Sequence, residues 1–317
     1  MNILNSFTAS LRPQAETASS RVMDLLAGPR RVLGLILRTN SGRVGFALVV
    51  IHLVLAFFGN KLAPYPPTQF HLSYQLTPPS RMFLLGTDQF GRDILSRIMS
   101  GAGSIIAISL AGTVLGIALG TLVGLSSAYI GGMFDEIIMR SMDGLMSFPS
   151  LLLALLVLTM IPKPGDWLPP ALAWDGLNVV LTIGVAFMPF VARVIRSATL
   201  PLKTAEFIQN ARLRGESSLY IMFVEILPNI VPVLIVEVSV RIGYAILLAS
   251  SLGFLGLGVQ PPSPDWGLMI SESRVFILNA PWVALAPAAA ISSLVVGVNL
   301  LSDGIRQAGG IPKKEAT

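Results

Sequence analysis

The sequence predicts an all-α membrane protein with six transmembrane helices, and three observations lead to this class. Only 12% of the 317 residues are charged and 53% are hydrophobic. A soluble domain carries about 25% charged residues, so this chain has too little polar surface to cover a soluble globule. Six intervals are poor enough in charge to cross a bilayer, and lysine and arginine gather in alternate loops.

The six helices follow from the intervals between charged residues, because a spanning helix needs about 20 mostly apolar residues. The spans are expected near 44–62, 102–128, 140–161, 176–196, 226–254 and 280–301. They divide the chain into an N-terminal tail (1–43), a first transmembrane helix (44–62), an extracytoplasmic segment (63–98), a five-helix core (99–305) and a C-terminal tail (306–317).

The basic residues orient these helices. If the N-terminus is cytoplasmic, the inner segments hold fifteen lysines and arginines and the outer segments hold six, with one more inside a span. Because cytoplasmic loops carry the excess of basic residues, both tails are expected to be cytoplasmic. The N-terminal residues lack the order of basic, apolar and small residues that marks a cleaved signal peptide.

The composition argues against several other classes of function. The net charge of +5 does not indicate nucleic-acid binding, because no basic patch is interleaved with aromatic residues. The absence of cysteine and the presence of only two histidines argue against a thiol nucleophile or a metal site. No phosphate loop of the pattern G-x-x-x-x-G-K-[ST] and no catalytic constellation occurs. We therefore expect no enzyme activity, no cofactor and no bound nucleotide on this chain.

The expected extracytoplasmic segment is rich in proline, which disfavours regular structure until "LLGTDQFGRDILSRIM" is reached. There, the side chain of Thr87 or Asp88 can cap a short helix that leads into the second span.

The most polar stretch of the second half, residues 206–229, lies on the expected cytoplasmic side. The cytoplasmic coupling loop expected here, residues 203–227, is called the signature loop below. "TAEFIQNARLRG" predicts a short helix that Thr204 can cap and that Gly215 can end in a left-handed conformation. "ESSLYIMFVEI" predicts a second helix. Ala211 and Gly215 then form a small face that can nest into a groove on a soluble partner. An ordinary polar loop is the alternative.

The spacing within this loop resembles that of the cytoplasmic signature loop of ABC importer permeases. Asn210 and Ala211 stand at its pair of small residues, Gly215 at its glycine and Leu227-Pro228 at its end. This sequence departs from the family pattern at Asn210, where alanine is frequent, and at Glu225, where an apolar residue is frequent.

Four further segments, in the same order along the chain, are similar to the C-type second permease subunit of the dipeptide/oligopeptide (nickel, opine) family. Gly103 and Ala249 stand where many relatives have arginine and glutamate. The segments are "LLGTDQFGRDILSRI" at 84–98, "MRSMDGLMSFPSLLLAL" at 139–155, "SLGFLGLGVQPPSPDWGLMI" at 251–270 and "NLLSDGIR" at 299–306.

The resemblance implies a type I ABC importer permease fold in a bacterial or archaeal cell (inner) membrane. It implies as partners a homologous second permease subunit, two cytosolic ATP-binding subunits that hold ATP and Mg, and an extracytoplasmic substrate-binding protein. An ion-coupled secondary transporter or channel and an intramembrane enzyme are the alternatives. The residues that the resemblance assigns to ATPase coupling are Glu206, Asn210, Ala211, Arg212, Leu213, Gly215, Glu216, Leu227 and Pro228.

Three features inside the spans also point to roles. Glu237 and Arg241 stand four residues apart in the fifth span, either as a polar lining of the pathway or as a structural ion pair. His52 is alone in an apolar span, where a packed, hydrogen-bonded side chain is favoured over a proton relay. A row of glycines in the second span predicts close helix packing in preference to a hinge: Gly112, Gly116, Gly120 and Gly124.

Overall fold

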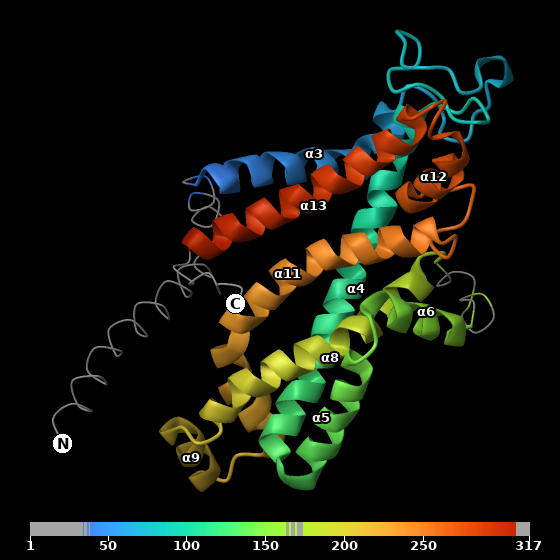
Figure 1. The fold of residues 1–317 in the computed structure, drawn as a ribbon. Helices are drawn as coiled ribbons and strands as arrows, with labels where there is room; N and C mark the ends of the chain where they lie inside the picture. The colour runs from blue at the N-terminus through green and yellow to red at the C-terminus, as the bar shows by residue number, and fades with distance from the viewer. Residues whose placement is uncertain are drawn as a thin grey trace. The chain divides into compact units, whose positions relative to one another are not determined.

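The computed structural model describes residues 39–162 and 174–308, together with residues 34, 37, 165 and 169. Within these residues the regular structure is helical, apart from one isolated bridge between Thr87 and Asp93. Five helices are long and apolar enough to cross a membrane, or six if the bent pair α5 and α6 is one span. The prediction of an all-α membrane protein is confirmed (Figure 1). The tails predicted at 1–43 and 306–317 lie almost wholly outside the described residues.

The long helices are joined by short helical pieces. The long ones are α3 (Asn40–Leu62), α4 (Ile94–Ile130), α8 (Leu177–Leu202), α11 (Leu227–Phe254) and α13 (Trp282–Ala308). The shorter ones are η1 (Leu72–Tyr74), α5 (Gly132–Met146), α6 (Ser150–Met160), α9 (Glu206–Leu213), α10 (Ser218–Tyr220), the π-helical segment η2 (Ile221–Ile226), α12 (Trp266–Ser273) and η3 (Arg274–Phe276).

Contacts divide the chain into two compact units, one from His52 to Val295 and one made of the residues on either side of that range. In the smaller unit, Gly45 of α3 lies against the backbone of Leu301 in α13, and a Cβ added to Gly297 would lie 2.8 Å from Cβ of Leu48. Side chains at these glycines would push the two helix segments apart.

In the larger unit, His52 is buried between neighbouring helices. Its Nε2 lies 3.2 Å from the hydroxyl oxygen of Ser293, and its ring meets that of Trp266 edge-on, with the ring centroids 6.1 Å apart. This environment supports the packed, hydrogen-bonded interpretation of His52.

The glycine row of α4 lies on the face that packs against α8. A Cβ added to Gly112, Gly116 or Gly120 would stand only 2.5–2.9 Å from a side-chain carbon of α8, and one added to Gly124 would meet a backbone carbonyl. The missing side chains therefore let the two helices approach closely. The facing residues of α8 are, in order, Ile183, Phe187, Val191 and Ala192.

The third predicted span, 140–161, is not a continuous helix. The chain bends by 103° between α5 and α6, and Pro149 is the residue that precedes α6. Proline disfavours helical conformation in the residue before it and cannot donate its own backbone hydrogen bond, so α5 ends at Met146. Two ion pairs tie α5 to α8. Arg196 donates to both carboxylate oxygens of Asp135 at 2.7 and 2.5 Å, and Arg193 pairs with Asp143.

The segment between α3 and α4 is organised by a buried carboxylate. Oδ2 of Asp88 accepts hydrogen bonds of 2.6 Å from both Arg92 and Arg97, and its Oδ1 accepts from two backbone N–H groups. Asp88 is 1% exposed, and a buried carboxylate without such partners would be strongly destabilising, so these hydrogen bonds stabilise the segment.

The short helix expected to follow a cap at Thr87 or Asp88 is not formed, and the next helix after η1 is α4 itself. Asp93, and not Thr87 or Asp88, caps α4 by accepting from the backbone N–H of Ser96 at 2.8 Å. Thr87 and Asp88 instead hold the preceding loop, since Thr87 Oγ1 accepts from the N–H of Thr77 at 2.9 Å. Both therefore lie outside the helix, which begins at Ile94.

A second buried carboxylate closes the loop after α11. Asp265 caps α12 by accepting from the N–H of Leu268 at 2.7 Å. Burial raises the pKa of Asp265 to about 6, although hydrogen bonds from the backbone of Leu268, Gly267 and Val259 act in the opposite direction. Gly253 at the end of α11 lies directly against this carboxylate.

Candidate functional site

The signature loop folds as α9 and α10 joined by a tight turn. Gly215 has a φ of +78°, and its N–H donates to the carbonyl oxygen of Arg212 at 2.9 Å. The N–H of Glu216 donates to the carbonyl oxygen of Ala211 at 3.2 Å. These two bonds form a Schellman motif, in which the left-handed residue is usually glycine because it has no Cβ. The structure thus gives Gly215 the conformation expected of it.

The expected cap of α9 is wrong. Its N-cap residue is Ala205, which has no side-chain cap, and the hydroxyl of Thr204 donates to the carbonyl oxygen of Pro201 at 3.2 Å. The short connection keeps Thr204 beside the last turn of α8, whose carbonyls lack helical partners. Ser217 does cap the second helix, since its hydroxyl accepts from the N–H of Tyr220 at 3.2 Å.

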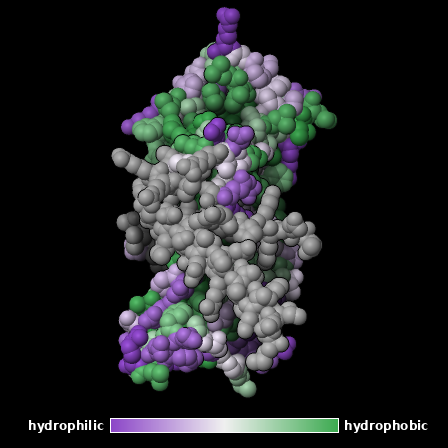
Figure 2. All heavy atoms as spheres, turned by 90° about the vertical axis from the view of Figure 1, so that its left-hand side faces the viewer, coloured by the Kyte–Doolittle hydropathy of each residue, from purple (hydrophilic) through white to green (hydrophobic). Residues whose placement is uncertain are grey.

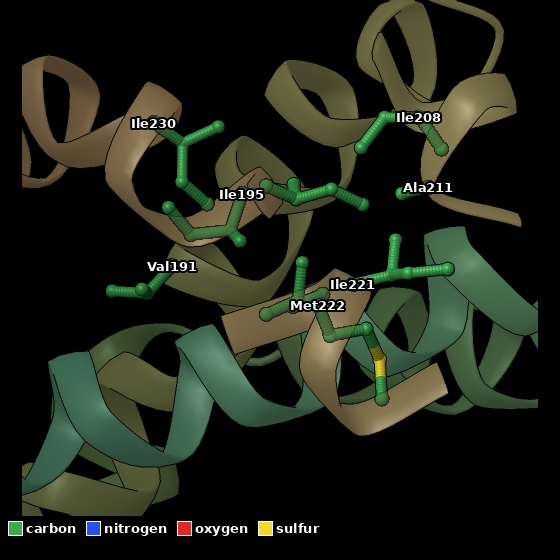
Figure 3. Packing of buried hydrophobic residues seen from close by; sticks show 9 residues of the cluster. Val191, Ile195, Ile208, Ala211, Ile221, Met222 and Ile230 are labelled. Atoms are coloured by element: carbon green, nitrogen blue, oxygen red, sulfur yellow. The ribbon is translucent and has the colours of Figure 1, made fainter. Parts of the chain in front are cut away.

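The inner face of the signature loop is buried in an apolar cluster (Figure 3). Ile208 and Ala211 of α9 share one face of the helix, and both are 0% exposed. The outward small face predicted at Ala211 and Gly215 is therefore wrong at Ala211, which the chain covers with its own side chains. The other members are Leu125 of α4, Val191 and Ile195 of α8, Ile221, Met222 and Ile226 of η2, and Ile230 of α11.

The outer face of the loop exposes both polar and apolar side chains. Leu213 is 86% exposed and Leu219 is 65% exposed. Figure 2 shows hydrophilic residues gathered at the lower end of that view, at the height at which α9 lies in Figure 1. Of the other predicted coupling residues, Glu206, Asn210, Arg212, Gly215 and Pro228 are exposed, and Glu216 and Leu227 are half-buried.

Glu225, which departs from the family pattern, has a local partner. Its carboxylate lies 3.2 Å from the guanidinium of Arg214, so this ion pair connects the turn after α9 to η2. The N–H of Leu227 donates five residues back, to Met222, which marks the wide π-helical turn. This wide turn precedes Pro228, whose ring would otherwise clash with the carbonyl four residues earlier.

Glu237 and Arg241 form an ion pair within α11. Their Nε to Oε2 distance is 3.1 Å, and their side chains are 13% and 15% exposed. The guanidinium carbon of Arg241 also lies 5.6 and 5.1 Å from the ring centroids of Phe187 and Phe190 in α8. Both charges are thus shielded, as is expected at mid-span.

Arg241 also lines a pocket of about 560 Å³ between α6, α8 and α11. No sequence pattern indicates the aromatic part of this wall, because Phe187 and Phe190 stand in an apolar span where such residues are common. Within the described residues, no group of three or more histidines and carboxylates could hold a metal ion. The pocket is lined by Ser150, Leu151, Phe187, Phe190, Val240, Arg241, Tyr244, Leu247, Leu248 and Ser251.

Comparison with known proteins decides the family. Residues 112–308 match the family described as binding-protein-dependent transport system inner membrane component. The chain belongs to this family of ABC importer permeases. It is 38% identical to the di/tripeptide transport system permease protein DppC of Pseudomonas aeruginosa, over 85% of this chain and 88% of that protein. It is 40% identical to the glutathione transport system permease protein GsiD of Escherichia coli, over 86% of each chain.

The fold matches that of a solved importer as well. A chain of the MetNI methionine ABC transporter in an inward-facing conformation superposes with a TM-score of 0.52 at 17% identity, over 67% of this chain and 95% of that one. This likeness confirms the predicted type I importer permease fold. Family membership also decides against the alternative of an ion-coupled secondary transporter or channel.

Proposed function

We propose that this chain is the second permease subunit of an ATP-driven importer and forms half of the pathway for di/oligopeptides or related small solutes. The names of its relatives, which transport di/tripeptides and glutathione, support this solute class. The partners are a homologous permease, two cytosolic ATP-binding subunits that hold ATP and Mg, and an extracytoplasmic substrate-binding protein. The complex lies in a bacterial or archaeal inner membrane, with both termini of this chain in the cytoplasm.

One observation carries the coupling mechanism: the signature loop is apolar and buried on one side and exposed on the other. Ile208 and Ala211 are 0% exposed in the cluster, whereas Leu213 is 86% exposed. Leu213 and Leu219 together place apolar surface on an otherwise polar face of the loop, and exposed apolar surface with a polar rim fits a docking contact with an ATPase subunit.

The buried side gives the loop a rigid connection to the spans. Side chains of α4, α8, η2 and α11 all contribute to the cluster that holds α9. Because packed interiors are close to solid density, a displacement of α9 by a closing ATPase pair is passed to these helices as a unit. Alternating access then follows from the movement of the helices against the second permease, while ATP hydrolysis takes place on the partners.

Reconstitution of the full complex in proteoliposomes tests this function. Uptake of a labelled dipeptide is expected to require ATP, both ATPase subunits and the binding protein, and to persist when ion gradients are collapsed by ionophores. Uptake driven by an ion gradient without ATPase subunits would contradict the proposal.

A further inference from the structure

The charge of Arg241 faces the pocket, while that of Glu237 does not. Arg241 is the one charged residue in the pocket wall among the described residues, and Glu237, one turn earlier, is not part of that wall. Among the residues that the structure describes, Glu237 accepts a hydrogen bond from Nε of Arg241 alone, at 3.1 Å. The pair is therefore asymmetric. Glu237 holds the guanidinium and partly neutralises it, while the cation is presented to the interior of the pocket.

The guanidinium retains unused hydrogen-bonding capacity. It has five N–H donors, and among the described residues only its Nε–H meets an acceptor. The rings of Phe187 and Phe190 contact it through their faces, which stabilises a cation without consuming N–H groups. The two terminal nitrogens are thus available to a bidentate acceptor such as a carboxylate.

The remaining wall suits the apolar part of a small solute. Tyr244, Leu247 and Leu151 surround the cation with aromatic and aliphatic surface. A volume of about 560 Å³ lies within the range of pockets that hold small ligands, about 300–1,000 Å³. A cation set among apolar walls is complementary to a molecule that carries one carboxylate and apolar side chains.

We propose that Arg241 binds the free C-terminal carboxylate of a peptide in transit through this pocket, with Phe187, Phe190 and Tyr244 in contact with the peptide side chains. This assignment rests on the proposed function. Arg241 lies near the middle of α11, so the site is reached after the binding protein has released the peptide. Glu237 keeps the net charge low, and the peptide can therefore leave as readily as it enters.

The test measures binding to the permease itself, without the binding protein. The permease pair with its ATPase subunits is placed in lipid nanodiscs and titrated with a labelled alanyl-phenylalanine dipeptide, as the free acid and as the C-terminal amide. The wild-type complex is expected to bind the free acid at least about tenfold more tightly, since loss of one charge-assisted contact corresponds to about that factor. In Arg241→Gln the two forms are expected to bind equally.

Two further variants keep the test decisive. Arg241→Gln leaves the Glu237 carboxylate alone in the span, so the double variant Arg241→Gln/Glu237→Gln removes both charges and should also lose the preference. The matched control is Arg274→Gln, an exposed arginine in η3 that should keep the wild-type preference. A free-acid preference that survives in both Arg241 variants, or its absence in the wild type, would overturn the proposal.

The outcome separates this inference from the proposed function. If ATP-dependent uptake of dipeptides by the reconstituted complex is absent, the proposed function fails. If uptake is present and both Arg241 variants still prefer the free acid, only the carboxylate site fails.

Discussion

Substitutions of Gly215 can distinguish two causes of lost coupling, namely backbone strain within the loop and a clash with a bound ATPase subunit. Gly215 has a φ of +78°, in the left-handed region, where a residue with a Cβ is destabilised by about 1–2 kcal/mol. Asparagine is destabilised less than other residues, because it adopts this conformation more readily. A Cβ built at this position meets no atom of the chain within 4 Å. The chain therefore opposes a Cβ at this position only through backbone strain, so a much larger loss in Gly215→Trp than in Gly215→Ala is expected to come from a partner.

Three variants of Gly215 differ in backbone strain and in side-chain size, and comparison of their effects distinguishes the two causes. Gly215→Asn is expected to couple ATP hydrolysis to uptake almost as the wild type does. Gly215→Ala should weaken the turn by about 1–2 kcal/mol and still assemble with the ATPase subunits. Gly215→Trp carries a similar backbone cost but adds a large ring at the docking face, so uptake per ATP is expected to fall by at least about tenfold, which corresponds to about 1.4 kcal/mol.

The assay compares uptake with binding-protein-stimulated ATP hydrolysis in proteoliposomes, after co-purification of the ATPase subunits has been checked. The matched control is Gly256→Trp, because Gly256 has a φ of +77° and equally open surroundings but follows the opposite end of α11. This control should retain its ATPase subunits. Wild-type coupling in Gly215→Trp, with the ATPase subunits bound, would refute the role of the loop.

Three further predictions concern topology, packing and pH. Single cysteines at Ser217 and Ser263 should react with impermeant reagents from opposite sides of the membrane, and labelling from one side only would exclude the topology. Gly120→Leu should lower the free energy of unfolding by about 1–3 kcal/mol through overpacking, whereas the exposed Val114→Leu should leave the thermal midpoint unchanged. Because the pKa of Asp265 is raised to about 6 from an unfolded value of about 3.9, its contribution to stability is complete below about pH 4 and is lost as the pH rises to about 6. Thermal midpoints measured across that window should fall more steeply in the wild type than in Asp265→Asn, and equal slopes would contradict the assignment.

The spans and the signature loop could be predicted because each depends on local sequence. Charge-poor intervals long enough to cross a bilayer identify α3, α4, α8, α11 and α13, since burying charge in lipid is costly. The turn at Gly215 likewise depends on local sequence, because a glycine directly after a helix favours the left-handed conformation that ends the helix. The spacing that relates this loop to the importer permeases is also contained within 19 residues, 210–228.

The features that escaped prediction depend on tertiary contacts. The orientation of α9 is one example, since burial of Ala211 is decided by Ile221 and Ile195, which belong to other helices. The role of Asp88 is another, because its partner Arg97 lies within α4, 9 residues further along the chain, and local capping rules do not reach that far. The pocket combines residues from three helices, and no single segment shows it. The bend at Pro149 has a local signal in the proline itself, although the length of the apolar interval 140–161 predicts one span.

The unbroken helical run Ser218–Phe254 provides a physical connection through which binding events at its two ends can be coupled. Its 37 residues extend about 55 Å, from the cluster that holds α9 to the carboxylate of Asp265 beside Gly253. Linkage between binding sites is reciprocal, so if nucleotide binding at one end of this rod changes the affinity for the binding protein at the other, the binding protein must change the affinity for nucleotide by the same factor. With the partners proposed above, solute bound by the binding protein would then change the affinity of the ATPase subunits for nucleotide.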